Sequence, residues 1–155
     1  MGRPSAVDIV RLLDLQPLPE EGGCYRVTWT TSDGSAIFFL LTAEELGFSA
    51  FHILSTDEIY HFYAGDPAEL HLLHPDGRHQ TVILGPHLEE GETPQAVAPG
   101  GTVQGSRVIS GGEYALLGTT MAPAFSTKDF HLSTRTELLS RYPHQADIIT
   151  ALTRK

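Results

Sequence analysis

Residues 51–65 read FHILSTDEIYHFYAG, and this stretch predicts two β-strands joined by a short turn. Side chains alternate along a strand, so His52 and Leu54 share one face of the first strand. By the same rule Glu58, Tyr60 and Phe62 share one face of the second strand. A polar group on a buried face costs about 1–3 kcal/mol unless it finds a partner. The stretch therefore predicts a face that borders a wet cavity or holds a hydrogen-bonded cluster.

Short apolar runs separated by turns continue along the chain, which has 15 Gly and 10 Pro among 155 residues. The predicted strands cover residues 24–31, 35–42, 50–54, 58–63, 69–74, 80–84, 95–98, 102–109 and 114–121. No helical pattern separates them, which argues against a parallel α/β sheet. About nine short strands with regularly spaced turns predict an all-β fold, either a β-sandwich or a jelly-roll barrel.

Capping signals predict helices at both ends of the chain. Ser5 followed by Asp8 resembles a capping box before a short amphipathic helix. Thr134 and Glu137 form a second capping box, and Pro143 ends that helix and starts another. We therefore expect a single domain over residues 1–155, with a helical N-terminus at about 5–14, a barrel at about 24–121 and a helical tail at about 134–153.

The composition argues against several classes of partner. The net charge of −9 disfavours nucleic acid and anionic membrane surfaces, because both need a basic face. The one cysteine, Cys24, leaves no internal disulfide and no thiolate metal cluster, which favours a reducing setting. The N-terminus lacks the apolar run of a signal peptide, and the longest apolar run, residues 36–41, is too short to span a bilayer. We therefore expect a cytoplasmic protein.

Candidate site residues follow from the strand alternation. If the side carrying Leu54 and Phe62 faces the barrel interior, then His52, Glu58 and Tyr60 converge inside the barrel. Gln104, after a glycine-rich turn, joins them from another strand. The ligand-binding set is then His52, Glu58, Tyr60, Phe62 and Gln104. Within it, His52 could act as a base, because histidine is the residue type suited to proton transfer near neutrality, Glu58 could orient it, and Tyr60 could donate a proton, which makes these three the candidate catalytic residues.

Each of these residues also has a simpler interpretation. His52 could be a core histidine bonded to an acid, Tyr60 a core aromatic with a bonded hydroxyl, and Gln104 a surface residue beside a turn. Other polar residues have simpler interpretations from the start. We expect the histidines around the predicted hairpin at residues 69–84, namely His71, His74, His79 and His87, to be solvated, and Trp29 to belong to the core or an interface.

The spacing of His52, Glu58 and Gly65 resembles the first sequence motif of the cupin superfamily, His-x-His followed by Glu and Gly. Leu54 stands at the position of the second His. The segment 99–104, PGGTVQ, resembles the second motif, Pro-x-Gly-x-x-His, with Gln104 in place of the His. The resemblance implies a cupin fold, a double-stranded β-helix jelly-roll barrel with short terminal helices.

The chain is most similar to cupin family 5, small single-domain cupins that were once classed as a domain of unknown function. The segments that carry this resemblance are 15–17, 20–23, 35–41, 51–52, 57–67, 84–86, 122–125, 129–130, 137–139 and 142–143. The family implies a homodimer with a pocket in the barrel and a fold similar to that of sugar-nucleotide epimerases, but no particular reaction. The apolar strand at 35–42 also favours a dimer.

The cupin positions also bear on metals. A metal-binding cupin typically offers three His and one Glu, the nitrogen and oxygen donors that suit transition metals. Here Leu54 cannot ligate and Gln104 is a weak donor, so His52 and Glu58 alone fall below the three ligands that a catalytic metal site usually needs. We expect no cofactor, with a weak divalent metal site at His52 and Glu58 as the open alternative.

Two functional hypotheses follow. The first is a cupin that binds a small polar, sugar-like or carboxylate ligand and acts as a metal-independent epimerase or isomerase. The second is a non-catalytic small-molecule-binding or structural homodimeric cupin, because one fold hosts many functions.

Overall fold

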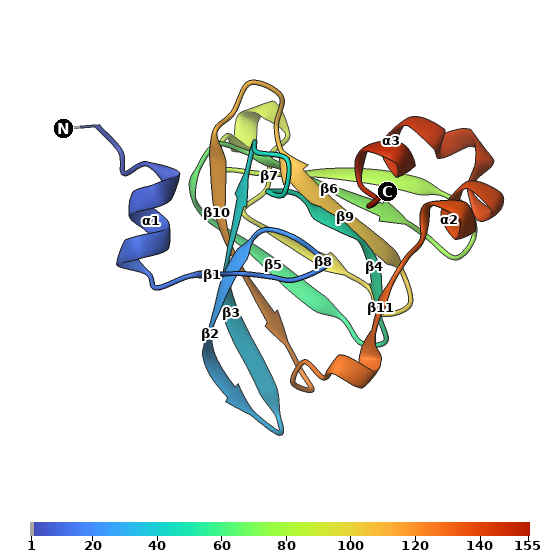
Figure 1. The fold of residues 1–155 in the computed structure, drawn as a ribbon, viewed down its shortest axis with the longest axis horizontal. Coiled ribbons are helices and arrows are strands. Elements are labelled where there is room, and N and C mark those ends of the chain that lie inside the picture. The colour runs from blue at the N-terminus through green and yellow to red at the C-terminus, as the bar shows by residue number, and fades with distance from the viewer. Residues whose placement is uncertain (1) are drawn as a thin grey trace.

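The computed structural model describes residues 2–155 and contains two antiparallel sheets that face each other (Figure 1). The six-stranded sheet has the order β1 (Gln16–Pro17), β2 (Cys24–Thr31), β3 (Gly34–Thr42), β10 (Tyr114–Met121), β5 (Glu58–Gly65) and β8 (Gln95–Ala98). The five-stranded sheet has the order β11 (Phe130–Leu132), β4 (Ser49–Leu54), β9 (Val103–Val108), β6 (Ala68–Leu73) and β7 (His79–Leu84). The predicted all-β barrel with terminal helices is confirmed.

Alternating apolar side chains of both sheets form the core between them. Phe39, Tyr60 and Leu117 come from the six-stranded sheet, whereas Leu70 and Leu72 come from the five-stranded sheet. All five are at most 2% exposed. The two sheets are therefore held together by packed hydrocarbon, into which the polar residues of the site are inserted.

The strand register sets which site residues are neighbours. In the β4–β9 pair His52 lies opposite Gln104, and in the β5–β10 pair Tyr60 lies opposite Thr119. Consecutive strands β4 and β5 thus belong to different sheets, and the turn at 55–57 between them crosses from one wall of the barrel to the other. This crossing brings polar residues of both sheets to one end of the barrel interior.

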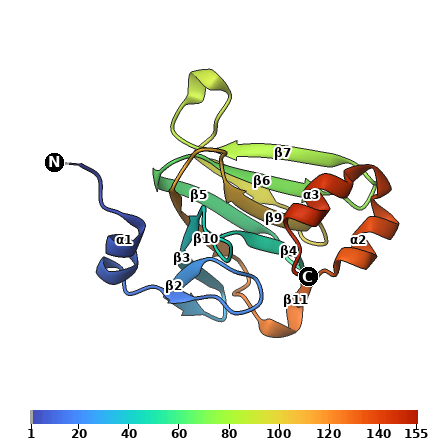
Figure 2. The same ribbon diagram turned by 45° about the horizontal axis from the view of Figure 1, so that its top comes forward.

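The C-terminal helices cover the outer face of the five-stranded sheet (Figures 1 and 2). They are α2 (Arg135–Arg141), the 3-10 turn η3 (Pro143–Gln145) and α3 (Ala146–Ala151), and α2 begins with the predicted Thr134–Glu137 capping box. Leu138 and Ile149 of these helices belong to the same buried cluster as Phe51, Leu73 and Val103 of the sheet. Two more 3-10 turns, η1 (Leu88–Glu90) and η2 (Thr127–Asp129), lie in loops.

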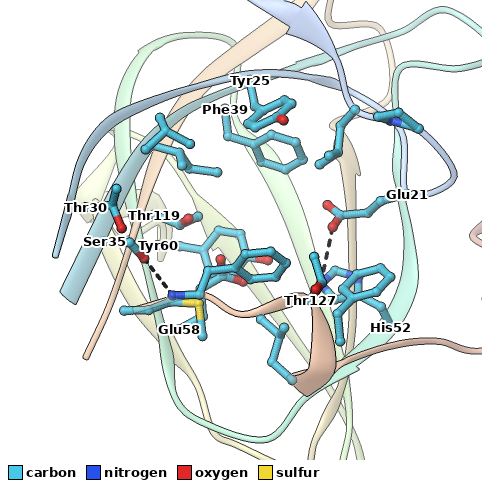
Figure 3. Close-up of a pocket in the computed structure, with 18 residues that line it drawn as sticks. Glu21, Tyr25, Thr30, Ser35, Phe39, His52, Glu58, Tyr60, Thr119 and Thr127 are labelled. Carbon is cyan, nitrogen blue, oxygen red and sulfur yellow. Dashed lines mark hydrogen bonds and ion pairs between the residues drawn. The ribbon is translucent and has the colours of Figure 1, made fainter. Parts of the chain in front are cut away.

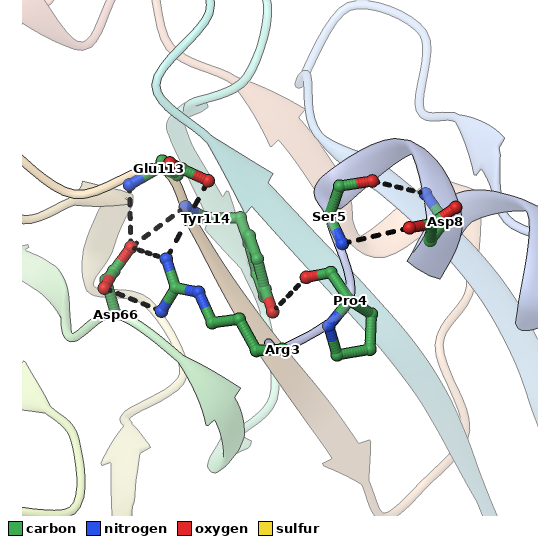
Figure 4. Close-up of polar contacts among 7 residues, drawn as sticks. All are labelled: Arg3, Pro4, Ser5, Asp8, Asp66, Glu113 and Tyr114. Atoms are coloured by element: carbon green, nitrogen blue, oxygen red, sulfur yellow. Dashed lines mark hydrogen bonds and ion pairs between the residues drawn. The ribbon is translucent and has the colours of Figure 1, made fainter. Parts of the chain in front are cut away.

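The N-terminal helix α1 (Ala6–Leu12), capped by Ser5 and Asp8 as predicted, is tied to the barrel by Arg3 (Figure 4). The Arg3 guanidinium donates two hydrogen bonds, of 2.9 and 2.8 Å, to the Asp66 carboxylate and lies 4.7 Å above the ring centre of Tyr114. The Tyr114 hydroxyl donates to the carbonyl oxygen of Pro4 at 2.8 Å. These contacts join the start of the chain to the turn after β5 and to β10.

The structure also differs from the sequence-based expectations. The short strands β1 and β11 were not predicted, since two or three residues are too few for an alternating pattern to be recognised. His71 and His74 are buried, at 5% and 9% exposure, so the prediction that both are solvated was wrong. The partners of His74 show why: its ring bonds Gln80 at 2.8 Å, and its carbonyl oxygen accepts a hydrogen bond from the Tyr142 hydroxyl.

Within residues 2–155, no helix has the length and apolar character needed to cross a bilayer.

Candidate functional site

A cavity of about 380 Å³ lies inside the barrel, between the two sheets (Figure 3). Much of its wall is aromatic or aliphatic, including Tyr25, Phe39, Leu54, Phe125 and Phe130. The polar groups in the wall are Glu21, Thr30, Ser35, His52, Glu58, Tyr60, Thr119 and Thr127. The volume falls at the lower end of the range for small-molecule sites, and a mainly apolar wall with a few polar groups is typical of them.

His52 is held in one orientation by its own strand. Its Nδ1 atom lies 2.7 Å from the carbonyl oxygen of Ala50, and the ring stacks on Phe130 at 5.2 Å between ring centres. A carbonyl oxygen can only accept, so Nδ1 carries the hydrogen. In the neutral ring the lone pair is then on Nε2, which lies 3.8 Å from the Glu21 Oε1 atom (Figure 3).

Glu21 was not among the predicted site residues. It lies in the loop between β1 and β2, where Ser49 donates to its Oε2 at 2.8 Å. The two glycines that follow, Gly22 and Gly23, have φ angles of 103° and 75°, a conformation that favours glycine. Arg154 donates to the Glu21 carbonyl oxygen at 2.7 Å and so fixes the turn from the C-terminal end. In the sequence, the acidic residues followed by Gly22 and Gly23 indicate a turn, but they do not show that this turn brings Glu21 to the cavity.

Glu58 begins β5 and is 8% exposed. Burial raises the pKa of Glu58, and the charge of Glu21 acts in the same direction. A positive charge on His52, and the hydroxyls of Thr119 and Tyr60, act in the opposite direction. The raised pKa favours the protonated carboxylic acid, which can donate a proton in a way that a surface carboxylate cannot.

The Tyr60 hydroxyl donates to the Oε1 atom of Gln104, and both residues are 1% exposed. Burial, together with the charges of Glu58 and Glu21, raises the pKa of Tyr60 well above its usual range. The phenol therefore stays protonated, and its hydrogen is directed at Gln104.

The structure brings three of the five predicted site residues to the cavity wall: His52, Glu58 and Tyr60. Gln104 lies behind Tyr60 as its hydrogen-bond acceptor and does not line the cavity. Phe62 packs against the barrel core instead of lining the cavity.

Comparisons with known proteins assign the chain to a family. Residues 7–133 match the family described as "Cupin superfamily (DUF985)". The chain belongs to this cupin family. No curated protein matches this cupin closely enough to be counted as similar.

Solved structures agree with this cupin assignment. A protein of Shewanella oneidensis is 33% identical, with a TM-score of 0.90 over 98% of this chain and 99% of that chain. A hypothetical protein from Leishmania major is 29% identical, with the same TM-score over 98% of this chain and 100% of that chain. An uncharacterized Klebsiella pneumoniae protein with a double-stranded β-helix domain is 19% identical, with a TM-score of 0.53 over 86% of this chain and 98% of that chain, and shows the fold alone.

The donor set of this cupin does not fit the metal centre of metal-binding cupins. Leu54 places hydrocarbon in the cavity wall at one ligand position, and the Gln104 oxygen at another accepts the Tyr60 hydroxyl. Of these motif positions His52 and Glu58 remain, fewer than the three protein ligands of a usual catalytic site, and within residues 2–155 Glu21 beside His52 does not complete a group close enough to hold an ion. Among residues 2–155, the group of three His and acidic side chains close enough to hold an ion is His87, Glu90 and Glu92, outside the cavity wall.

Proposed function

We propose that this cupin binds a small neutral, sugar-like molecule in its barrel and moves a proton on it without a metal, as an epimerase or isomerase. One observation carries the proposal: His52 directs Nδ1 at the Ala50 carbonyl oxygen and turns Nε2 toward Glu21, while the cavity they share also contains Glu58, whose pKa is raised by burial. A base and an acid of different strength in one cavity are the requirements of proton transfer at carbon.

The cavity wall supports a neutral ligand over a carboxylate. The cavity wall contains 18 described residues, and none of them is Lys or Arg. Two of them, Glu21 and Glu58, are acidic. A carboxylate or phosphate would have to pair with His52, which already faces the Glu21 carboxylate. Hydroxyl and carbonyl groups could bond the polar residues, while aromatic rings such as Phe39 and Phe130 pack against the carbon skeleton.

The proposed step begins at His52. Its Nε2 takes a proton from a carbon next to a carbonyl group, and the bonding electrons move to the carbonyl oxygen as an enolate. Glu21 stabilises the imidazolium that forms. Glu58, from the other sheet, returns a proton to the same carbon from a different side, and the electrons move back to restore the carbonyl group. Proton exchange with water resets both side chains. Tyr60 positions Glu58 and does not transfer the proton.

Solvent deuterium exchange tests this proposal directly. Neutral sugars that bind in a thermal-shift screen are incubated with the protein in D2O, and deuterium at carbon is followed by NMR. We expect incorporation with the wild type, also after chelator treatment, and a loss of about 100-fold or more in H52Q and in E58Q. The matched control is H61Q, because His61 lies on the opposite face of β5 from Glu58 and Tyr60 and bonds Thr120. Exchange that survives H52Q would refute the assignment of the base.

The alternative is a binding cupin without catalysis. The mainly hydrocarbon wall and the hydrogen bond of Tyr60 to Gln104 favour it, because a binding site needs no proton transfer. A sugar that raises the melting temperature but takes up no deuterium would decide for this alternative.

We also propose that the chain forms a homodimer. Trp29 of β2 is 52% exposed and does not line the cavity, and Trp is enriched at protein–protein interfaces. A dimeric mass in light scattering that falls to a monomeric mass in W29S would support this assignment; a monomeric wild type would contradict it.

A further inference from the structure

The barrel cavity has two parts with different chemistry. The polar part contains the residues of the proposed reaction, His52, Glu21 and Glu58. A second part lies against β2, β3 and the loop that precedes β2, and we call it the apolar lobe. The residues of the apolar lobe are Leu18, Pro19, Tyr25, Val27, Ile37 and Phe39. Apart from the Tyr25 hydroxyl, these side chains offer no group that forms hydrogen bonds.

The strand register explains the position and the length of the apolar lobe. Tyr25 lies opposite Phe39, and Val27 lies opposite Ile37, so two neighbouring pairs of β2 and β3 turn apolar side chains to the barrel interior. Further along β2 the wall is polar again at Thr30. Residues two apart on a strand are separated by about 6.8 Å. The apolar lobe therefore has about the length of one six-membered ring.

The register also connects the apolar lobe to the polar part. Ile37 lies opposite Thr119 in the β3–β10 pair, and the Thr119 hydroxyl acts on Glu58 through a hydrogen bond. One row of side chains across the sheet thus changes from hydrocarbon to hydroxyl. Figure 3 shows Tyr25 and Phe39 together on the side of the cavity opposite Glu58. A single bound molecule can therefore meet polar groups at one end and hydrocarbon at the other.

The apolar lobe exposes hydrocarbon to water. Val27 is 48% exposed although it lines the cavity, and Tyr25 and Ile37 are half-buried. Covering apolar surface of this kind is favourable. A sugar hydroxyl placed against it would lose its bonds to water and gain no partner, which costs free energy. A free sugar therefore suits the polar part of the cavity and leaves the apolar lobe unfilled.

We propose that the molecule bound in this cavity carries a phenyl-sized apolar group on its neutral, sugar-like head, and that this group fills the apolar lobe. The rings of Tyr25 and Phe39 favour a planar ring over an alkyl chain, because paired aromatic rings gain more than the area that they bury. Val27 and Ile37 select the group by its size. The head of the ligand rests on the proposed function, whereas the apolar group is inferred from the cavity wall alone.

Matched neutral glycosides test the apolar lobe without requiring turnover. The methyl and phenyl β-glycosides of glucose, galactose, mannose and xylose are titrated into the protein and followed by calorimetry. We expect the phenyl member of at least one pair to bind about 10- to 100-fold more tightly than its methyl partner, the gain from burying one phenyl-sized group. Glycosides have no free carbonyl group, so this measurement does not depend on proton transfer.

The variant V27F fills the apolar lobe with a ring of the protein itself. We expect it to bring the affinity for the phenyl glycoside down to that of the methyl partner. V27D, which makes the lobe polar without filling it, should also remove the phenyl preference. The matched control is V97F, because Val97 is likewise 48% exposed but pairs with Ile59, on the opposite face of the same sheet. V97F should bind both glycosides as the wild type does, and the melting temperature of each variant checks its fold.

A third probe, 4-phenyl-2-butanone, separates the apolar lobe from the sugar-like head, since it joins a phenyl group to a carbonyl group without a sugar. If this ketone binds the wild type and not V27F while no glycoside binds, the sugar-like head is wrong and the apolar lobe stands. Equal binding of phenyl and methyl glycosides, together with deuterium exchange on a free sugar, would remove the lobe and leave the proposed function. The proposal is also overturned if V27F keeps the phenyl preference, if V97F loses it, or if neither the glycosides nor the ketone bind.

Discussion

The Nδ1 atom of His52 lies 2.7 Å from the carbonyl oxygen of Ala50, two residues earlier on the same strand. This contact fixes the tautomer without any acidic partner at Nδ1, so the Glu21 carboxylate is free to act on the other nitrogen. The proposed base, His52, and the carboxylate beside it thus come from different segments, β4 and the loop after β1.

The first prediction concerns Glu21. Replacing it by Gln keeps the size of the side chain and removes the charge 3.8 Å from His52 Nε2, so the imidazolium formed in the proposed step is less stable. We expect E21Q to lower the rate of deuterium exchange by about 10- to 100-fold while E21D keeps part of the activity. S49A, which removes only a hydrogen bond to Glu21, should have a smaller effect. Wild-type exchange in E21Q would show that Glu21 has no such role.

The second prediction is a pH dependence of stability that depends on Glu58. Burial raises the pKa of Glu58 above its ordinary 4.5, so the folded protein holds this proton more tightly than the unfolded chain does. The contribution of the proton to stability is fully present below the unfolded pKa and is lost as the pH rises through the folded pKa. Urea unfolding should therefore show the wild type losing stability relative to E58Q as the pH rises above about 4.5. Parallel pH profiles of the two proteins would contradict this.

The third prediction uses the buried pair of Tyr60 and Gln104. Y60F leaves the Gln104 oxygen without its donor, and Q104L leaves the Tyr60 hydroxyl without its acceptor. Each change should lower the free energy of unfolding by about 1–3 kcal/mol, and the double variant should lose less than the sum, because no orphaned polar group remains. Chemical denaturation of the four proteins measures this coupling. Y60F should lower deuterium exchange less than E58Q does, since the phenol positions Glu58 but does not transfer the proton in the proposed step.

The fourth prediction concerns the attachment of α1. The hydrogen bond from Arg3 lowers the pKa of Asp66 from its ordinary 3.8 to about 2. The stability that the ionised Asp66 contributes is therefore fully present above pH 3.8 and is lost as the pH falls through about 2. R3A should speed amide exchange in α1 at neutral pH, with little effect on the barrel strands. R11A is the control, because the Arg11 guanidinium pairs with Asp8 within the same helix. Equal exchange in wild type and R3A would show that Arg3 does not hold the helix.

Strand alternation predicted the fold and the cavity residues wherever the strands are regular. It placed His52, Glu58 and Tyr60 on the inner side of the barrel, where all three line the cavity. It also placed Phe62 on the inner side, where this residue packs against the barrel core, but the cavity does not extend to it. The alternation of side chains predicts which face of the sheet a residue occupies, but not how far the cavity extends along the strand.

Two further features could not be derived from local patterns. Glu21 reaches the cavity through a turn whose position depends on Arg154, more than a hundred residues away in the sequence. His71 belongs to a polar hairpin that looks solvated, yet β9 pairs with β6 on its other side and carries Arg107 to Glu69. In both cases the decisive partner is distant in sequence, and only the folded arrangement shows it.

The contact of Arg154 with the Glu21 turn has a practical consequence. The Arg154 side chain donates to the carbonyl oxygens of Glu20, Glu21 and Phe48, so this one residue supports the turn that carries Glu21. A truncation that removes Arg154, or the substitution R154A, would loosen the Glu21 turn without touching a strand. Proteins prepared for ligand screens should therefore keep this arginine.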